Sequence, residues 1–116
     1  MTLSNCHLKL LKQLHQDPDF GNTSVLYAPL VILLIDQYKA NSISDYGAGK
    51  CGLKNKIIEL GSSDSKYYPY DPAFPNYGPP KSADLVCCIN VLEYVEPEFL
   101  EAVLLDLKKI TNITRK

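Results

Sequence analysis

The sequence shows no excess of charge of either sign. Its 12 lysine and arginine residues are balanced by 13 acidic residues, which gives a formal net charge of −1 at pH 7. A general nucleic-acid-binding protein or a membrane-surface protein typically carries a clear basic excess. Neither class is therefore expected, and a content of 46% hydrophobic and 22% charged residues is typical of an ordinary soluble protein.

Metal-ligand spacing is also missing. The two histidines, His7 and His15, stand eight positions apart and away from any zinc-type pattern. The chain has four cysteines, none of them in a C-x-x-C pair: Cys6, Cys51, Cys87 and Cys88. We therefore expect no metal site, and we interpret the cysteines as thiols in a reducing compartment.

No long hydrophobic run is present. The longest, LVILLI at 30–35, is far shorter than the roughly 18 apolar residues of a membrane-spanning helix. The N-terminus lacks the basic region, apolar core and cleavage site of a secretory signal. A cytoplasmic protein without a membrane partner is expected, and a length of 116 residues suits a single domain.

Helical and extended patterns alternate along the chain. Helices are expected over 3–16, from Pro29 to about 39 (where a strand is the alternative), over 53–60 and from Pro97 to about 110. Strands are expected over 42–47, 66–71 and 84–90, and the proline-rich 72–82 is expected to be irregular, like the break at 17–22. This order implies an α/β fold with a mostly parallel sheet of about three strands.

Two of these helices show an apolar stripe that predicts a buried face. In the first helix the stripe is Leu3, Cys6, Leu10, Leu11 and Leu14. In the last helix it is Leu100, Val103, Leu104, Leu107 and Ile110.

The most informative stretch is DYGAGKCG, which begins at Asp45 and leads from an expected strand into an expected helix. Gly47, Gly49 and Gly52 spell G-x-G-x-x-G. A phosphate-binding P-loop is excluded, because the second conserved glycine of that motif must be followed by lysine and then serine or threonine, and Gly52 is followed by leucine. A dinucleotide-binding loop fits the spacing better, since Asp71 lies 19 residues beyond Gly52. The pattern alone is also compatible with a plain strand-to-helix turn.

Asp45 distinguishes between possible ligands. A carboxylate two residues before the first glycine repels a pyrophosphate, whereas it attracts a cationic ligand. S-adenosylmethionine carries an ammonium and a sulfonium group, so the D-x-G-x-G order favours this methyl donor over NAD.

Three ordered motifs resemble the class I S-adenosylmethionine-dependent methyltransferases: ISDYGAGKCGL, YDPA and ADLVCCINVLEYVEPEFLEAVLLDL. The resemblance spans residues 42 to 111 and implies a Rossmann-like sheet that binds S-adenosylmethionine or its product S-adenosylhomocysteine. Asp45 would meet the amino group, and Asp71 would bind both ribose hydroxyls. The implied cofactor-binding residues are Asp45, Tyr46, Gly47, Ala48, Gly49, Asp71, Pro72, Ala73 and Asn90.

Other interpretations of these residues stay open. Asp71 before Pro72 is also typical of a turn, and Asn90 is also typical of a cap. The chain is expected to transfer a methyl group to an unidentified acceptor or, alternatively, to be a non-catalytic cofactor-binding subunit or a partner-dependent half enzyme. An NAD-binding oxidoreductase fragment is the weaker alternative.

The chain also departs from the family pattern. Only 12 residues separate Asp71 from Asp84, too few for the family's next helix and third strand. The chain stops at Lys116, after the helix that follows the fourth strand. We therefore expect one truncated domain over 1–116, with N-terminal helices over 1–41, a core over 42–116 and strand order 2-1-4. The apolar fourth strand would form an edge, which predicts self-association or a partner chain that covers it.

Overall fold

The computed structural model describes residues 3–16, 23–61, 64–89 and 91–111. Its helices are α1 (Asn5–Leu14), α2 (Ala28–Tyr38), α3 (Gly52–Glu59) and α4 (Leu100–Ile110), and its strands are β1 (Ser42–Tyr46), β2 (Lys66–Tyr70) and β3 (Leu85–Cys87). Short 3₁₀ turns are η1 (Thr23–Tyr27), η2 (Pro75–Tyr77), η3 (Leu92–Tyr94) and η4 (Pro97–Phe99). The break predicted at 17–22 lies outside the described residues.

The three strands form one open, all-parallel sheet in the order β2-β1-β3. The central strand β1 pairs with β2 along its whole length, from Ser42 opposite Lys66 to Tyr46 opposite Tyr70. On its other side β1 pairs with β3, from Ile43 opposite Leu85 onward. The predicted α/β class, the parallel sheet and the strand order are confirmed, and the arrangement is consistent with a minimal Rossmann-like fold.

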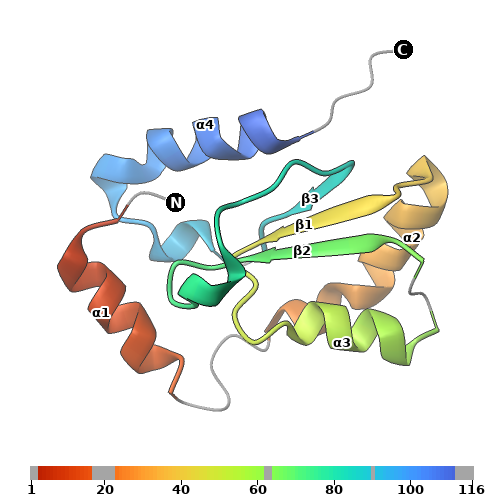
Figure 1. Ribbon diagram of the computed structural model, residues 1–116, viewed down its shortest axis with the longest axis horizontal. Helices are drawn as coiled ribbons and strands as arrows, with labels where there is room; N and C mark the ends of the chain where they lie inside the picture. The colour runs from red at the N-terminus through yellow and green to blue at the C-terminus, as the bar shows by residue number, and fades with distance from the viewer. Residues whose placement is uncertain (1–2, 17–22, 62–63, 90, 112–116) are drawn as a thin grey trace.

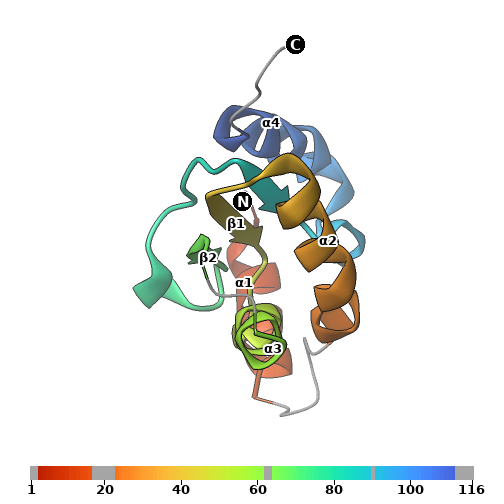
Figure 2. The same cartoon turned by 90° about the vertical axis from the view of Figure 1, so that its right-hand side faces the viewer.

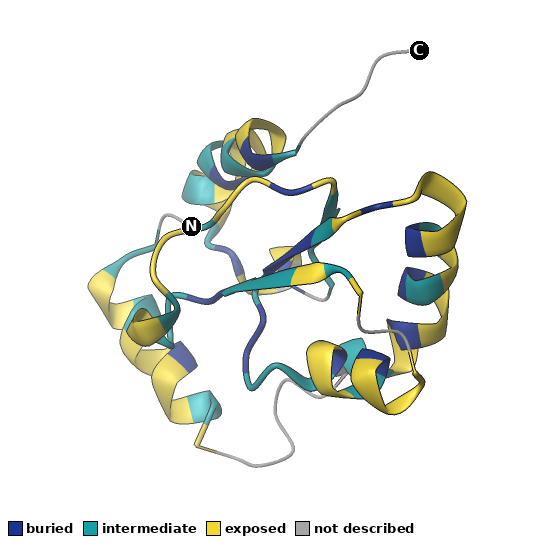
Figure 3. Ribbon diagram, turned by 45° about the vertical axis from the view of Figure 1, so that its right-hand side comes forward, coloured by how far each residue is buried: buried dark blue, intermediate teal, exposed yellow. Residues whose placement is uncertain are grey.

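Helices cover both faces of this sheet. Helix α4 lies over one face, and α2 and α3 lie over the other (Figures 1 and 2). Successive side chains of a strand point to opposite faces, so β1 supplies a core residue to each layer. Ile43 packs with α2 and α3, whereas Tyr46 packs with α4. The buried residues of α2 and α3 accordingly face the sheet (Figure 3).

Proline and glycine positions explain several element boundaries. Pro29 lies in the first turn of α2, where a missing N–H is tolerated, and the alternative strand at this position is wrong. Gly61 follows α3 with a positive φ of +86°. Pro69 lies in β2, which is an edge strand, where a residue without an N–H is tolerated. No helix within the described ranges is long and apolar enough to cross a membrane.

Both predicted apolar stripes are partly wrong. In α1 only Leu11 is buried, and Cys6 and Leu10 are exposed. In α4 Val103 and Ile110 are buried, whereas Leu100 and Leu104 are exposed (37% and 47%). The cause is the number of covering layers, because none of the described helices and strands packs along the outer side of α1 or α4 (Figure 1).

The third strand is shorter than predicted. Residue 90 of the predicted strand 84–90 lies outside the described residues, and within 84–89 the strand covers Leu85–Cys87, of which Cys87 is buried and the other two residues are half-buried. β3 lies at the edge of the sheet, so it is not enclosed as a central strand would be. Beyond it, a single parallel bridge joins Ala83 to Thr111. Thr111, directly after α4, therefore lies beside the residue that precedes this edge strand, and association with another chain stays a prediction.

Candidate functional site

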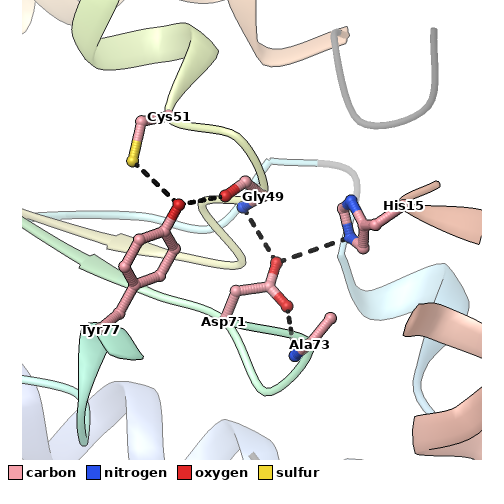
Figure 4. A network of polar contacts seen from close by, with 6 residues as sticks. All are labelled: His15, Gly49, Cys51, Asp71, Ala73 and Tyr77. Atoms are coloured by element: carbon pink, nitrogen blue, oxygen red, sulfur yellow. Dashed lines mark hydrogen bonds and ion pairs between the residues drawn. The ribbon is translucent and has the colours of Figure 1, made fainter. Parts of the chain in front are cut away.

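The candidate site lies at the carboxyl ends of β1 and β2. The glycine loop begins directly after β1, and Asp71 directly follows β2. Because the two strands are parallel neighbours, their carboxyl ends bring the loop and the acid together. Figure 4 shows the resulting network of polar contacts.

Asp71 holds two segments of backbone. Its Oδ2 accepts a hydrogen bond from the Gly49 N–H at 2.9 Å, and its Oδ1 accepts one from the Ala73 N–H, also at 2.9 Å. The residue is only 7% exposed. The carboxylate therefore has the alternative role of a turn residue, and it also ties the turn after β2 to the glycine loop.

The other amide groups of the loop bind inside the protein as well. The N–H groups of Gly47 and Ala48 both donate to the Tyr70 carbonyl, at 2.7 and 2.9 Å. The Cys51 N–H donates to the Ala48 carbonyl at 3.0 Å. The start of the loop is thus hydrogen-bonded to the last residue of β2, and these N–H groups are not available to bind an anion.

Both glycines at the start of the loop are required by geometry. Gly47 has a φ of +92°, and a Cβ there would lie 2.3 Å from Cγ2 of Val91. Gly49 has a φ of +55°, and a Cβ there would lie 3.2 Å from Cε1 of His15. Positive φ favours glycine, so the backbone gives a sufficient reason for each residue before any ligand is considered.

Gly47→Ala is expected to lower the free energy of unfolding by roughly 1–3 kcal/mol more than Gly61→Ala. Both positions have positive φ, so the backbone strain of an added Cβ is common to the two variants. Only at Gly47 does the new methyl group meet another atom, since nothing lies within 4 Å at Gly61. Denaturant unfolding measures the difference. Equal losses would show that Val91 yields without cost, whereas recovery in Gly47→Ala/Val91→Ala would confirm the clash.

Tyr77 fixes the far side of the loop. Its hydroxyl donates to the Gly49 carbonyl at 2.7 Å and accepts from the Cys51 thiol at 3.4 Å. Burial, helped by the Cys51 contact, raises the pKa of Tyr77, so the hydroxyl keeps its proton and stays a donor. Its ring stacks on that of Phe74, with centroids 5.4 Å apart.

Asp45 is buried on the face of the sheet that carries α2 and α3. Its side chain is 2% exposed, and its Oδ2 accepts a hydrogen bond from the Tyr67 hydroxyl. Burial raises the pKa of Asp45 to about 6; the Tyr67 bond opposes this shift, and the charge of Asp71 adds to it. The site thus holds two acidic groups, one of which is costly to ionise.

His15 approaches the site from the end of α1. Its Nε2 lies 3.8 Å from Oδ2 of Asp71, and its ring packs edge-on against Phe74 with centroids 5.0 Å apart. Burial lowers the pKa of His15, and this effect outweighs the attraction of Asp71 for the charged form. The imidazole is therefore neutral at pH 7, and packing holds it more than charge does.

Three predicted cofactor-binding residues remain: Tyr46, Pro72 and Asn90. The Tyr46 side chain points into the core on the α4 side, where its hydroxyl donates to Oδ2 of Asp106 at 3.2 Å. Strand alternation forces this, because its neighbour Asp45 occupies the opposite face. Pro72 is half-buried in the turn after Asp71. Asn90 lies outside the described residues.

Sequence reasoning missed His15 as part of this site. It gave His15 no role, because a single histidine at the end of a helix carries no motif. Within the described ranges, no group of three or more histidine, cysteine or acidic side chains is placed to hold a metal ion.

Comparisons with known proteins add no family to this geometry. No family model, curated protein or solved structure matches the chain.

Proposed function

We propose that this protein binds S-adenosylmethionine or S-adenosylhomocysteine at the carboxyl ends of β1 and β2. The observation that carries the proposal is the meeting of the D-x-G-x-G turn with a buried acid from the neighbouring parallel strand. The Asp71 carboxylate lies 2.9 Å from the Gly49 amide, so one group at the end of β2 borders the glycine loop that follows β1. A carboxylate with unused lone pairs suits the two hydroxyls of a ribose.

The charges at the site favour a cationic ligand over NAD. A pyrophosphate placed on the loop would lie beside two acidic side chains, Asp45 and Asp71, both of them buried. The amide groups of Gly47, Ala48, Gly49 and Cys51 already have acceptors within the protein. The ammonium and sulfonium of the methyl donor would instead meet acids.

Methyl transfer is the reaction that such a site would support. The bound donor supplies an activated methyl group, and the chain's part is to hold the donor and orient an acceptor. The acceptor is not identified by the residues at the site.

A non-catalytic cofactor-binding protein is the second candidate, and one observation favours it. Between β2 and β3 the chain forms only the short turn η2, where the resembled family has a further helix and a third strand. A partner-dependent half enzyme is a version of the same candidate.

S-adenosylhomocysteine and S-adenosylmethionine are expected to raise the melting temperature, and NAD is not. At a hundredfold excess over the dissociation constant, linkage adds about 2.7 kcal/mol to the free energy of unfolding. For a domain of this size the shift is on the order of 10 °C. Thermal unfolding with each ligand, followed by calorimetry, measures this. A shift with NAD alone would overturn the proposal in favour of the oxidoreductase alternative.

A further inference from the structure

Helix α1 lies beyond the carboxyl ends of the strands, beside the candidate site (Figure 1). Its beginning is attached to the segment after β3. The Ser4 N–H donates to Oε1 of Glu96 at 2.8 Å, and Nε2 of His7 makes a hydrogen bond with the Tyr94 carbonyl. Its end places His15 against Asp71. The helix therefore spans from the loops behind β3 to the glycine loop.

His15 occupies one side of the carboxylate that would bind a ribose. Each oxygen of Asp71 already accepts one backbone hydrogen bond, so only one lone-pair direction is left on each oxygen. His15 approaches Oδ2 from another direction than the Gly49 amide does (Figure 4). The same imidazole lies against the open side of Gly49, where a Cβ would meet it at 3.2 Å. A ribose whose two hydroxyls bound both oxygens of Asp71 would therefore need the space beside Oδ2 that His15 occupies.

The attachment of α1 is of a kind that can be released. Among the residues of α1 only Leu11 is buried, so little apolar surface holds the helix to the rest of the protein. The helix has 10 residues, and isolated helices of that length are marginal in water. The neutral His15 leaves no unpaired charge behind when it moves away from Asp71. Its anchor at Tyr94 is exposed and its anchor at Glu96 is half-buried, and neither residue belongs to a core cluster.

We propose that α1 closes the candidate site in the ligand-free protein, with His15 as the group that must leave Asp71 before an adenosyl ligand can bind. The inference rests on the proposed function, since it concerns access to the same site. Only the open molecules can bind, so closure reduces the apparent affinity to the intrinsic affinity multiplied by the open fraction. Loosening α1 at any of its anchors increases the open fraction and therefore raises the apparent affinity.

Three variants test this closure. His15→Ala removes the group that blocks Asp71. His7→Ala removes the anchor at Tyr94, which is not part of the ribose site, so an effect there on ligand affinity must pass through α1. Lys9→Ala is the matched control, because this lysine is exposed on the same helix. Calorimetry with S-adenosylhomocysteine gives the affinity, and hydrogen exchange of the α1 amides in the ligand-free protein reports how firmly the helix is held.

The expected result is a roughly three- to tenfold tighter affinity for His15→Ala and a smaller gain for His7→Ala, with faster exchange of α1 in both. Lys9→Ala should match the wild type. Binding by His15→Ala alone, with none by the wild type, would also support the closure.

Three outcomes would overturn the closure. Wild-type binding with equal or weaker binding by His15→Ala would refute it while leaving the proposed function standing. Unchanged exchange of α1 in His15→Ala would refute it whether or not ligand binds. Absence of S-adenosylhomocysteine binding in the wild type and in all three variants would refute the proposed function itself, and the closure with it.

Discussion

Asp71→Ala is expected to destabilise the protein and to weaken an adenosyl ligand about a hundredfold or more. The buried carboxylate accepts two backbone hydrogen bonds, from Gly49 and Ala73, and bonds to a charged group contribute roughly 1.5–3 kcal/mol each. A loss of roughly 3–6 kcal/mol in the free energy of unfolding follows. The loss of two further hydrogen bonds, from the ribose hydroxyls to Asp71, accounts for the expected fall in affinity.

The two effects of Asp71→Ala separate the structural role of this residue from its proposed ligand role. Denaturant unfolding measures the first, and calorimetry with S-adenosylhomocysteine, under conditions where the variant is folded, measures the second. Asp84→Ala is the matched control, because its exposed carboxylate accepts one backbone bond, from Asn41 at 2.9 Å, away from the site. If the Asp71→Ala protein is destabilised but binds with wild-type affinity, Asp71 has a role in the turn and does not bind the ribose.

Asp45→Asn is expected to stabilise the ligand-free protein above pH 6 by up to about 3 kcal/mol. Burial raises the pKa of Asp45 from its ordinary 3.8 to about 6. Between these two values the folded protein holds a proton that the unfolded chain has lost. The free energy of unfolding therefore falls as the pH rises from about 4 to about 6, by about 1.4 kcal/mol for each pH unit, and stays lower above that range. Asparagine does not ionise and escapes this loss.

Unfolding curves of wild type and Asp45→Asn at pH 4, 5, 6, 7 and 8 measure the effect. The difference between the two proteins isolates Asp45 from the other carboxylates that titrate in the same range. The free energies of unfolding of the two proteins should approach one another near pH 4, and the difference between them should grow up to about pH 6. Tyr67→Phe removes the hydrogen bond that favours the charged form, so it should raise the pKa of Asp45 further and extend the fall to higher pH. A difference in the free energy of unfolding between wild type and Asp45→Asn that is the same at all five pH values would contradict the prediction.

The same Asp45→Asn protein addresses why a costly acid is present. If Asp45 meets the ammonium group of the ligand, the variant should bind S-adenosylhomocysteine more weakly and adenosine as well as the wild type does. A variant that is more stable but binds the ligand more weakly is the pattern expected when the wild-type residue is retained for binding. Equal affinity for both ligands would remove Asp45 from the proposed site.

The sequence by itself determined the elements and their order. Pro29 marked the start of α2 and Pro97 the turn that leads into α4, because proline restricts its own backbone, and the glycine-rich stretch marked the passage from strand to helix, because glycine permits a positive φ. The parallel pairing followed from the alternation of helices and strands, and it brought Asp71 to the glycine loop as the spacing suggested. These are local constraints, and local sequence carries them.

Only the tertiary structure decided which side chains face one another across elements. It placed Val91 against Gly47, the Tyr67 hydroxyl on Asp45 and His15 beside Asp71, and it left part of each predicted apolar stripe exposed. The physical reason is that these contacts depend on how the layers stack and on what covers each face. An apolar period shows that one side of a helix can be buried, but the number of neighbouring layers determines how much of it is.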